Sequence, residues 1–122
     1  MNSLDKAMEL KRRTKSFAIR IVILFRSLPH SPAAQTLGKQ LLRSGTSVAA
    51  NYRAVCRARS QAEFVARMGI VVEEADESVL WLELLGETGV VRQERTQDLL
   101  SEANELVKIF GASLRTYKHA VK

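Results

Sequence analysis

Helix-breaking residues and cysteine are scarce in this chain of 122 residues. It contains two prolines and six glycines, which leaves long stretches free to form helices. Its single cysteine, Cys56, excludes an internal disulfide and fits a reducing compartment. No apolar run approaches the ~18 residues that a membrane span needs, and the longest, residues 21–25, lies between Arg20 and Arg26. The length is that of one domain, which we expect to comprise residues 1–122.

An uninterrupted apolar segment is also missing near the N-terminus, where a signal peptide would require one. The residues that interrupt it are Lys11, Arg12, Arg13 and Lys15. Together with the single cysteine, this pattern predicts a cytoplasmic protein without a membrane partner.

Histidine, which many catalytic and metal sites require, occurs only twice, as His30 and His119. A di-iron helix bundle uses Glu-x-x-His motifs on two helices, and no glutamate here has a histidine three residues later. His30 falls in a predicted loop and His119 near the end of the last predicted helix. Cys56 has arginine neighbours that would favour a thiolate, but no histidine partner is evident. We therefore expect no enzyme, with no catalytic residues, no metal and no cofactor.

Acidic residues are absent between Glu9 and Glu63, so charge is divided unevenly along the chain. Residues 1–62 hold 12 Lys and Arg against 2 Asp and Glu, a net charge of +10. Residues 63–122 hold 7 against 11, a net charge of −4. Such a field attracts polyanions, and it also complements the acidic half of the same chain or of a neighbouring one.

Four segments have apolar residues at three- and four-residue spacing, which predicts four amphipathic helices. We expect these helices at residues 3–28, 32–57, 60–85 and 92–119. Ser31 before Pro32, and Ser60 three residues before Glu63, are N-terminal capping signals. Each helix has about 25 residues and is roughly 38 Å long. Matched lengths and short connections predict an all-α fold, an up-down-up-down antiparallel four-helix bundle.

The first two helices carry features that the fold must accommodate. The apolar stripe of the first helix starts at Leu4 and Met8 and weakens at Lys11 and Thr14. The middle of the second helix, residues 44–50, has low helix propensity, which close packing of another helix against small side chains can offset. A glycine-rich phosphate loop is excluded there, because no GxxxxGK pattern and no preceding strand exist.

The third predicted helix is apolar on two sides. Its core face consists of Phe64, Met68, Val71, Ala75, Val79 and Leu82. Ile70, Trp81 and Leu84 fall on roughly the opposite side, among acidic residues. Such a helix has more apolar surface than one small core accepts, so we predict an oligomer interface formed by Ile70, Glu77, Trp81 and Leu84. The alternative is a broad helix packed between two neighbours inside the monomer.

Several carboxylates of this helix also suggest a metal or an acid-base site. They are Glu73, Glu74, Asp76 and Glu77. Because no histidine or second carboxylate-bearing helix accompanies them, we interpret them as a solvated or ion-paired face.

A motif in the centre of the chain resembles a known family. The matching residues are Gln40, Leu41, Arg43, Ser44, Ser47, Val48, Ala50, Asn51, Arg57, Ser60, Glu63 and Phe64. With its helix lengths, the chain resembles over nearly its whole length the four helix bundle proteins also called 23S rRNA intervening-sequence proteins. The resemblance implies a bacterial cytoplasmic bundle that assembles as a homopentamer.

The same resemblance extends in fold to the accessory variability determinants of diversity-generating retroelements. Those proteins are basic pentamers that bind nucleic acid and a reverse transcriptase, which makes RNA or DNA and a reverse transcriptase the implied partners. The chain departs from the family pattern after Asn51. Many relatives carry a glutamate there, whereas this chain reads Tyr52-Arg53-Ala54-Val55, so the role of that carboxylate is not carried over.

Two groups of basic residues are candidate nucleic-acid-binding sites. One consists of Arg43, Arg53, Arg57 and Arg59, and the other of Lys11, Arg12, Arg13 and Lys15. Arginine binds phosphate bidentately, and repetition around an oligomer would add avidity. The opposing interpretation is that these arginines pair with the acidic half of the chain. A different function class stays open as well, a scaffolding oligomer that binds another protein without nucleic acid.

Overall fold

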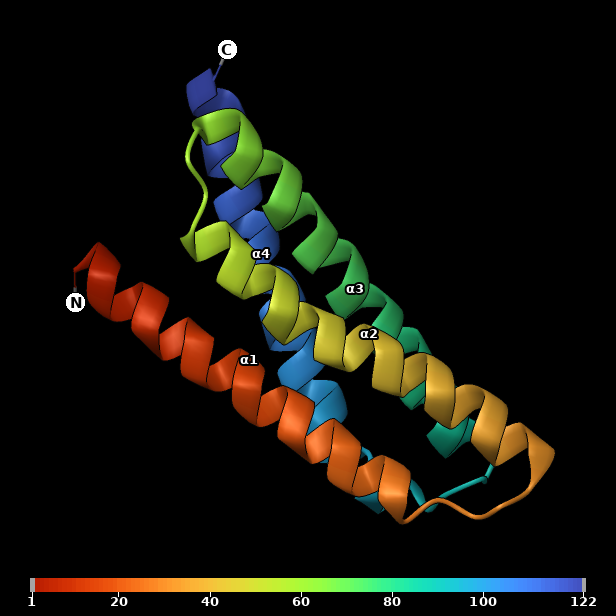
Figure 1. Cartoon of the computed structure of the whole chain (residues 1–122). Helices are drawn as coiled ribbons and strands as arrows, with labels where there is room; N and C mark the ends of the chain where they lie inside the picture. The colour runs from red at the N-terminus through yellow and green to blue at the C-terminus, as the bar shows by residue number, and fades with distance from the viewer. Residues whose placement is uncertain (1, 122) are drawn as a thin grey trace.

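Four long helices run in alternating directions through the computed structural model, which describes residues 2–121 and the side chains of residues 2–118 (Figure 1). They are α1 (Ser3–Arg26), α2 (Pro32–Cys56), α3 (Gln61–Glu87) and α4 (Gln97–Val121), with a 3-10 turn η1 at Gln93–Arg95. The predicted all-α antiparallel bundle is confirmed. The side chain of His119 lies outside the described part. No helix of the described residues has both the length and the apolar character needed to cross a membrane.

The helices begin at the capping residues that the sequence indicated. Ser31 accepts a hydrogen bond from the backbone N–H of Ala34 at 3.2 Å, and Ser60 accepts one from Glu63 at 3.0 Å. The carboxylate of Glu63 accepts in turn from the N–H of Arg59 at 3.2 Å. In this capping box the carboxylate of Glu63 accepts from the residue before the N-cap, Arg59, and not from Ser60 itself. The two hydrogen bonds fix the turn between α2 and α3.

The last helix begins later than predicted. Residues 93–95 form the turn η1 and α4 starts at Gln97, not near Arg92. Thr96 is buried, and its hydroxyl donates to the carbonyl of Gln93 at 3.1 Å. This side chain lies against α3 at Gly86, where an added Cβ atom would come within 3.0 Å of its hydroxyl oxygen. The connection also contains Gly89, whose φ of +77° is open to glycine without strain.

The buried apolar residues of all four helices form one cluster. In this cluster α3 packs against both α2 and α4, while α1 packs mainly against α2. The N-terminal half of α1 diverges from the other helices (Figure 1). Leu4 and Met8, at which the predicted apolar stripe starts, are 69% and 50% exposed. The stripe therefore continues past the point where another helix covers it.

Small residues in the middle of α2 allow two helices to approach it. Ser44 faces α3, where its hydroxyl lies 2.8 Å from that of Ser78 in a buried hydrogen bond. Gly45 faces α1, and a Cβ atom there would lie only 2.9 Å from Cγ1 of Ile21. The close packing expected from this run of small residues is confirmed by these two contacts.

A pair of glycine substitutions tests this packing. Gly45→Ala is expected to lower the free energy of unfolding by about 1 kcal/mol, because overpacking against the fully buried Ile21 outweighs the gain in helix propensity. Gly69→Ala is the matched control. No atom lies within 4 Å of its added Cβ, so we expect a gain of about 0.5–1 kcal/mol. Urea unfolding measures both, and equal stabilisation by the two substitutions would contradict the close approach.

Candidate functional site

An open hollow on the outer side of the α2–α3 hairpin collects four arginines. Its volume is about 590 Å³. Arg53 reaches it from the last turn of α2, Arg57 and Arg59 from the connecting turn, and Arg67 from α3. The other lining residues are Thr46, Ala49, Ala50, Ala54 and Glu63. The small side chains of α2 therefore form part of a concave surface with guanidinium groups around it.

None of these four arginines forms an ion pair with the residues that the structure describes. Glu63 is the one carboxylate among the lining residues, and it accepts a hydrogen bond from the backbone of Arg59. Four like charges around one hollow repel each other. A bound polyanion would relieve this repulsion and would be held by bidentate hydrogen bonds.

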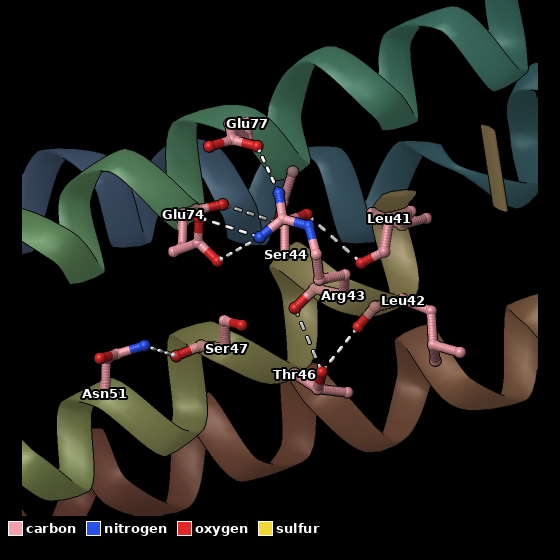
Figure 2. A network of polar contacts seen from close by, with 10 residues as sticks. Leu41, Leu42, Arg43, Ser44, Thr46, Ser47, Asn51, Glu74 and Glu77 are labelled. Atoms are coloured by element: carbon pink, nitrogen blue, oxygen red, sulfur yellow. Dashed lines mark hydrogen bonds and ion pairs between the residues drawn. The ribbon is translucent and has the colours of Figure 1, made fainter. Parts of the chain in front are cut away.

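Arg43, grouped with this cluster from the sequence, is engaged elsewhere. Its guanidinium extends from α2 to two carboxylates of α3, donating to Glu74 at 3.1 Å and to Glu77 at 2.6 Å (Figure 2). Glu74 is a buried residue, only 8% exposed. Arg43 therefore pairs with the acidic half of the chain, as the opposing interpretation of the sequence expected for these arginines.

Arg13, from the second predicted group, is likewise paired. It donates from Nε and Nη2 to the two carboxylate oxygens of Glu102 on α4, at 3.0 and 2.7 Å. This hydrogen bonding raises the pKa of Arg13 above its ordinary value. The pair connects α1 to α4, two helices that otherwise touch little.

The remaining members of the second group lie exposed on α1. They are Lys11, Arg12 and Lys15. Arg12 lines a shallow surface hollow with Asp5, Met8 and Glu9, so nearby carboxylates offset its charge. This patch is more mixed in charge than the arginine hollow, and its hollow is smaller, about 250 Å³, which makes it the weaker of the two candidate sites.

The predicted interface residues of α3 occupy different environments. Ile70 is 38% exposed, while Trp81 and Leu84 are half-buried. Trp81 packs at the edge of the apolar cluster, and its indole N–H is buried without a hydrogen-bond partner among the described residues. Glu77 is drawn towards α2 by Arg43. Ile70 is therefore the predicted residue most available to a neighbouring subunit.

Two features were not identified from the sequence. Arg67 joins the hollow, although it belongs to the acidic half of the chain. Exposed apolar residues also gather on α1, where Ile19 and Ile23 accompany Leu4, Met8 and Val22. The spacing of Ile19 and Ile23 places them on one helix face, but only the arrangement of the helices shows that this face is uncovered.

Two side chains that could ionise, Tyr52 and Cys56, lie close in sequence to the arginines of the hollow. Tyr52 is buried with its ring centroid 5.0 Å from that of Phe110, and this burial raises the pKa of Tyr52 well above its usual range. Cys56 is a free, exposed cysteine at the end of α2, but it is not among the lining residues of the hollow. The polar groups of the side chains that line the hollow are the four guanidinium groups, the hydroxyl of Thr46 and the carboxylate of Glu63.

The fold and this hollow define a helix-bundle protein with an open basic site, and comparison with known proteins identifies its family. The sequence model of the 23S rRNA-intervening sequence protein family matches residues 6–112. The chain belongs to this family, as the motif between Gln40 and Phe64 predicted.

A solved relative has the same fold. It is the crystal structure of a protein with unknown function from the S23 ribosomal protein family of Bacteroides thetaiotaomicron VPI-5482. The two sequences are 34% identical, the alignment covers 86% of this chain and 97% of that one, and the TM-score is 0.80. Among curated proteins, none matches the chain.

Removing the cation that faces the buried Glu74 should destabilise the bundle. Arg43→Met keeps the aliphatic length of the side chain but leaves this carboxylate without its partner. We expect the free energy of unfolding to fall by about 1–3 kcal/mol. The control, Arg92→Met, changes an exposed arginine in the α3–α4 connection and should alter stability by less than about 0.5 kcal/mol. If urea unfolding shows that both substitutions lower the free energy of unfolding by the same small amount, the bridge between α2 and α3 is only a surface ion pair.

Proposed function

We propose that this protein is a nucleic-acid-binding accessory protein that acts as a homo-oligomer and not as an enzyme. The observation that carries the proposal is the hollow with four arginines that form no ion pair with the described residues, in a chain whose arginines at positions 13 and 43 do form them. Unpaired guanidinium groups on a concave surface are suited to phosphate groups. The net charge of +6 adds long-range attraction for RNA or DNA.

Oligomerisation would strengthen such binding, because each subunit would contribute one hollow to the same extended polyanion. The family resemblance supports five subunits, a bacterial cytoplasmic setting and a reverse transcriptase as a candidate protein partner. The lining residues of the hollow are arginine, alanine, threonine and one glutamate, a set that favours binding over chemistry.

A scaffolding role without nucleic acid is the second candidate function. The uncovered apolar residues of α1 favour it, since Ile19 is 50% exposed and Ile23 is 59% exposed. Apolar residues gathered on one exposed helix face are typical of a protein-binding surface. Here that face is also basic, through Arg12, Lys15 and Arg26, and it would suit an acidic helix of a partner or of another copy.

The oligomer can be tested at the exposed part of the predicted interface. Light scattering of the wild-type protein should give a mass several times 13.6 kDa, with five subunits as the expected number. Ile70→Glu should reduce this mass, because it places a charge in an apolar contact at little cost to the bundle itself. Trp81→Glu should do the same, but its half-buried ring makes some destabilisation inevitable.

Ala66→Glu is a control for Ile70→Glu, since Ala66 is exposed one turn earlier on α3. A monomeric wild-type protein with an intact circular dichroism spectrum would contradict the oligomer. An unchanged mass for Ile70→Glu would remove this residue from the interface.

Nucleic-acid binding can be tested by fluorescence anisotropy with a labelled duplex over a range of salt concentrations. If each hollow contacts three or four phosphates, raising the salt from 50 to 200 mM should weaken binding by about 40- to 150-fold. The variant R53Q/R57Q/R67Q should bind at least about tenfold more weakly at low salt. Its glutamines preserve helix propensity, so its unfolding midpoint in urea should be no lower than that of the wild type.

The control K39Q/R92Q/R115Q removes three positive charges from exposed positions outside the hollow. We expect it to lose less than about threefold in affinity, because these charges act only at long range. Equal losses for the two triple variants would mean that net charge, and not the hollow, governs binding. No binding of the wild type at low salt would exclude the nucleic-acid function and leave the scaffolding role.

A further inference from the structure

We infer that the arginine hollow binds the phosphate backbone of double-stranded nucleic acid and does not read its bases. This inference rests on the proposed function and specifies the ligand class of the same site. It follows from the shape of the hollow and from the side chains that line it.

Reading base edges requires a protein element that enters a groove of the duplex. The arginines instead surround a concave surface that is formed in part by the small side chains of α2. A concave surface fits the protruding phosphate backbone, because it does not reach into a groove. Arginine donates hydrogen bonds in a fork that matches phosphate oxygens. The guanidinium groups therefore contact phosphates and leave the base edges unread.

Single strands are commonly bound by stacking their bases on aromatic rings. Among the residues whose side chains the structure describes, no aromatic one lines the hollow. The nearest aromatic side chains along the chain are already paired, Tyr52 with Phe110 and Phe64 with Tyr117, whose ring centroids lie 4.3 Å apart. A single strand would thus gain only charge, and its phosphates are less closely spaced than those of a duplex. The hollow therefore favours the duplex.

Glu63 sets the strength of this phosphate binding. It is the one negative charge among the lining residues, so it repels phosphate wherever the phosphate lies in the hollow. Glu63→Gln removes this charge but keeps an oxygen that can accept the hydrogen bond from Arg59. A variant that gains affinity cannot be explained by misfolding, which makes it a sharp test of the site.

The experiment compares four labelled probes of equal length with the full chain at 50 mM salt. Two are duplexes, one rich in A·T and one rich in G·C pairs, and two are the corresponding single strands. We expect the duplexes to bind equally within about threefold and each single strand to bind at least threefold more weakly. Glu63→Gln should raise the affinity for both duplexes by the same factor, about two- to fivefold. R53Q/R57Q/R67Q should lower the affinity for both duplexes.

Inorganic tripolyphosphate, added as a competitor, separates a duplex site from a site for a small oligophosphate. We expect it to displace the duplex only at concentrations far above that of the duplex. Displacement at equal concentration would overturn the inference in favour of a compact ligand. A tenfold preference for one duplex sequence, or for a single strand, would also overturn it while leaving the proposed function standing. Failure of all four probes to bind would instead refute the proposed function.

Discussion

Close packing on two sides of α2, at the neighbouring residues Ser44 and Gly45, is the constraint on which the bundle depends. Ser44 meets Ser78 of α3 in a buried hydrogen bond, and Gly45 leaves room for Ile21 of α1. Because the two residues are adjacent, larger side chains at this point would displace two helices at once. Arg43, the residue before them, then ties the outer surface of α2 to α3. The hollow next to this seam owes its position to the same helix pair.

Most of the architecture could be predicted from the sequence, because apolar spacing and capping residues determine where helices form. Ser31 and Ser60 cap the helices as predicted, and the buried residues Met68, Val71 and Leu82 lie on the predicted core face of α3. The exposure of Leu4 could not be predicted. Periodicity shows that a helix has an apolar side, but whether another helix covers that side depends on how far the helices diverge. The turn at residues 93–95 was missed as well; the buried Thr96 that follows it contacts Gly86 of α3, and periodicity does not reveal such a contact.

The candidate site was predictable only in part. The sequence grouped Arg43, Arg53, Arg57 and Arg59 because they lie close together along α2 and its turn. Whether an arginine of α2 forms an ion pair depends instead on which residue of α3 lies at the same level along the helix axis. Glu74 and Glu77 meet Arg43, whereas the side of α3 that faces the end of α2 presents Arg67. Because α3 contributes Arg67, the site is a concave surface between two helices and not a run of basic residues along one helix. The sequence does not show this, since it depends on the register between α2 and α3.

The position of α1 at one side of the bundle sets this helix apart from α2 and α3. Both α2 and α3 pack against two neighbouring helices, whereas α1 packs mainly along one seam with α2 and is joined to α4 by the pair between Arg13 and Glu102. Detaching α1 would expose that seam and leave the packing of α3 against α2 and α4 in place. Local opening of α1 therefore requires less free energy than opening of a helix packed between two neighbours. A helix held in this way could exchange between copies while the other three stay packed.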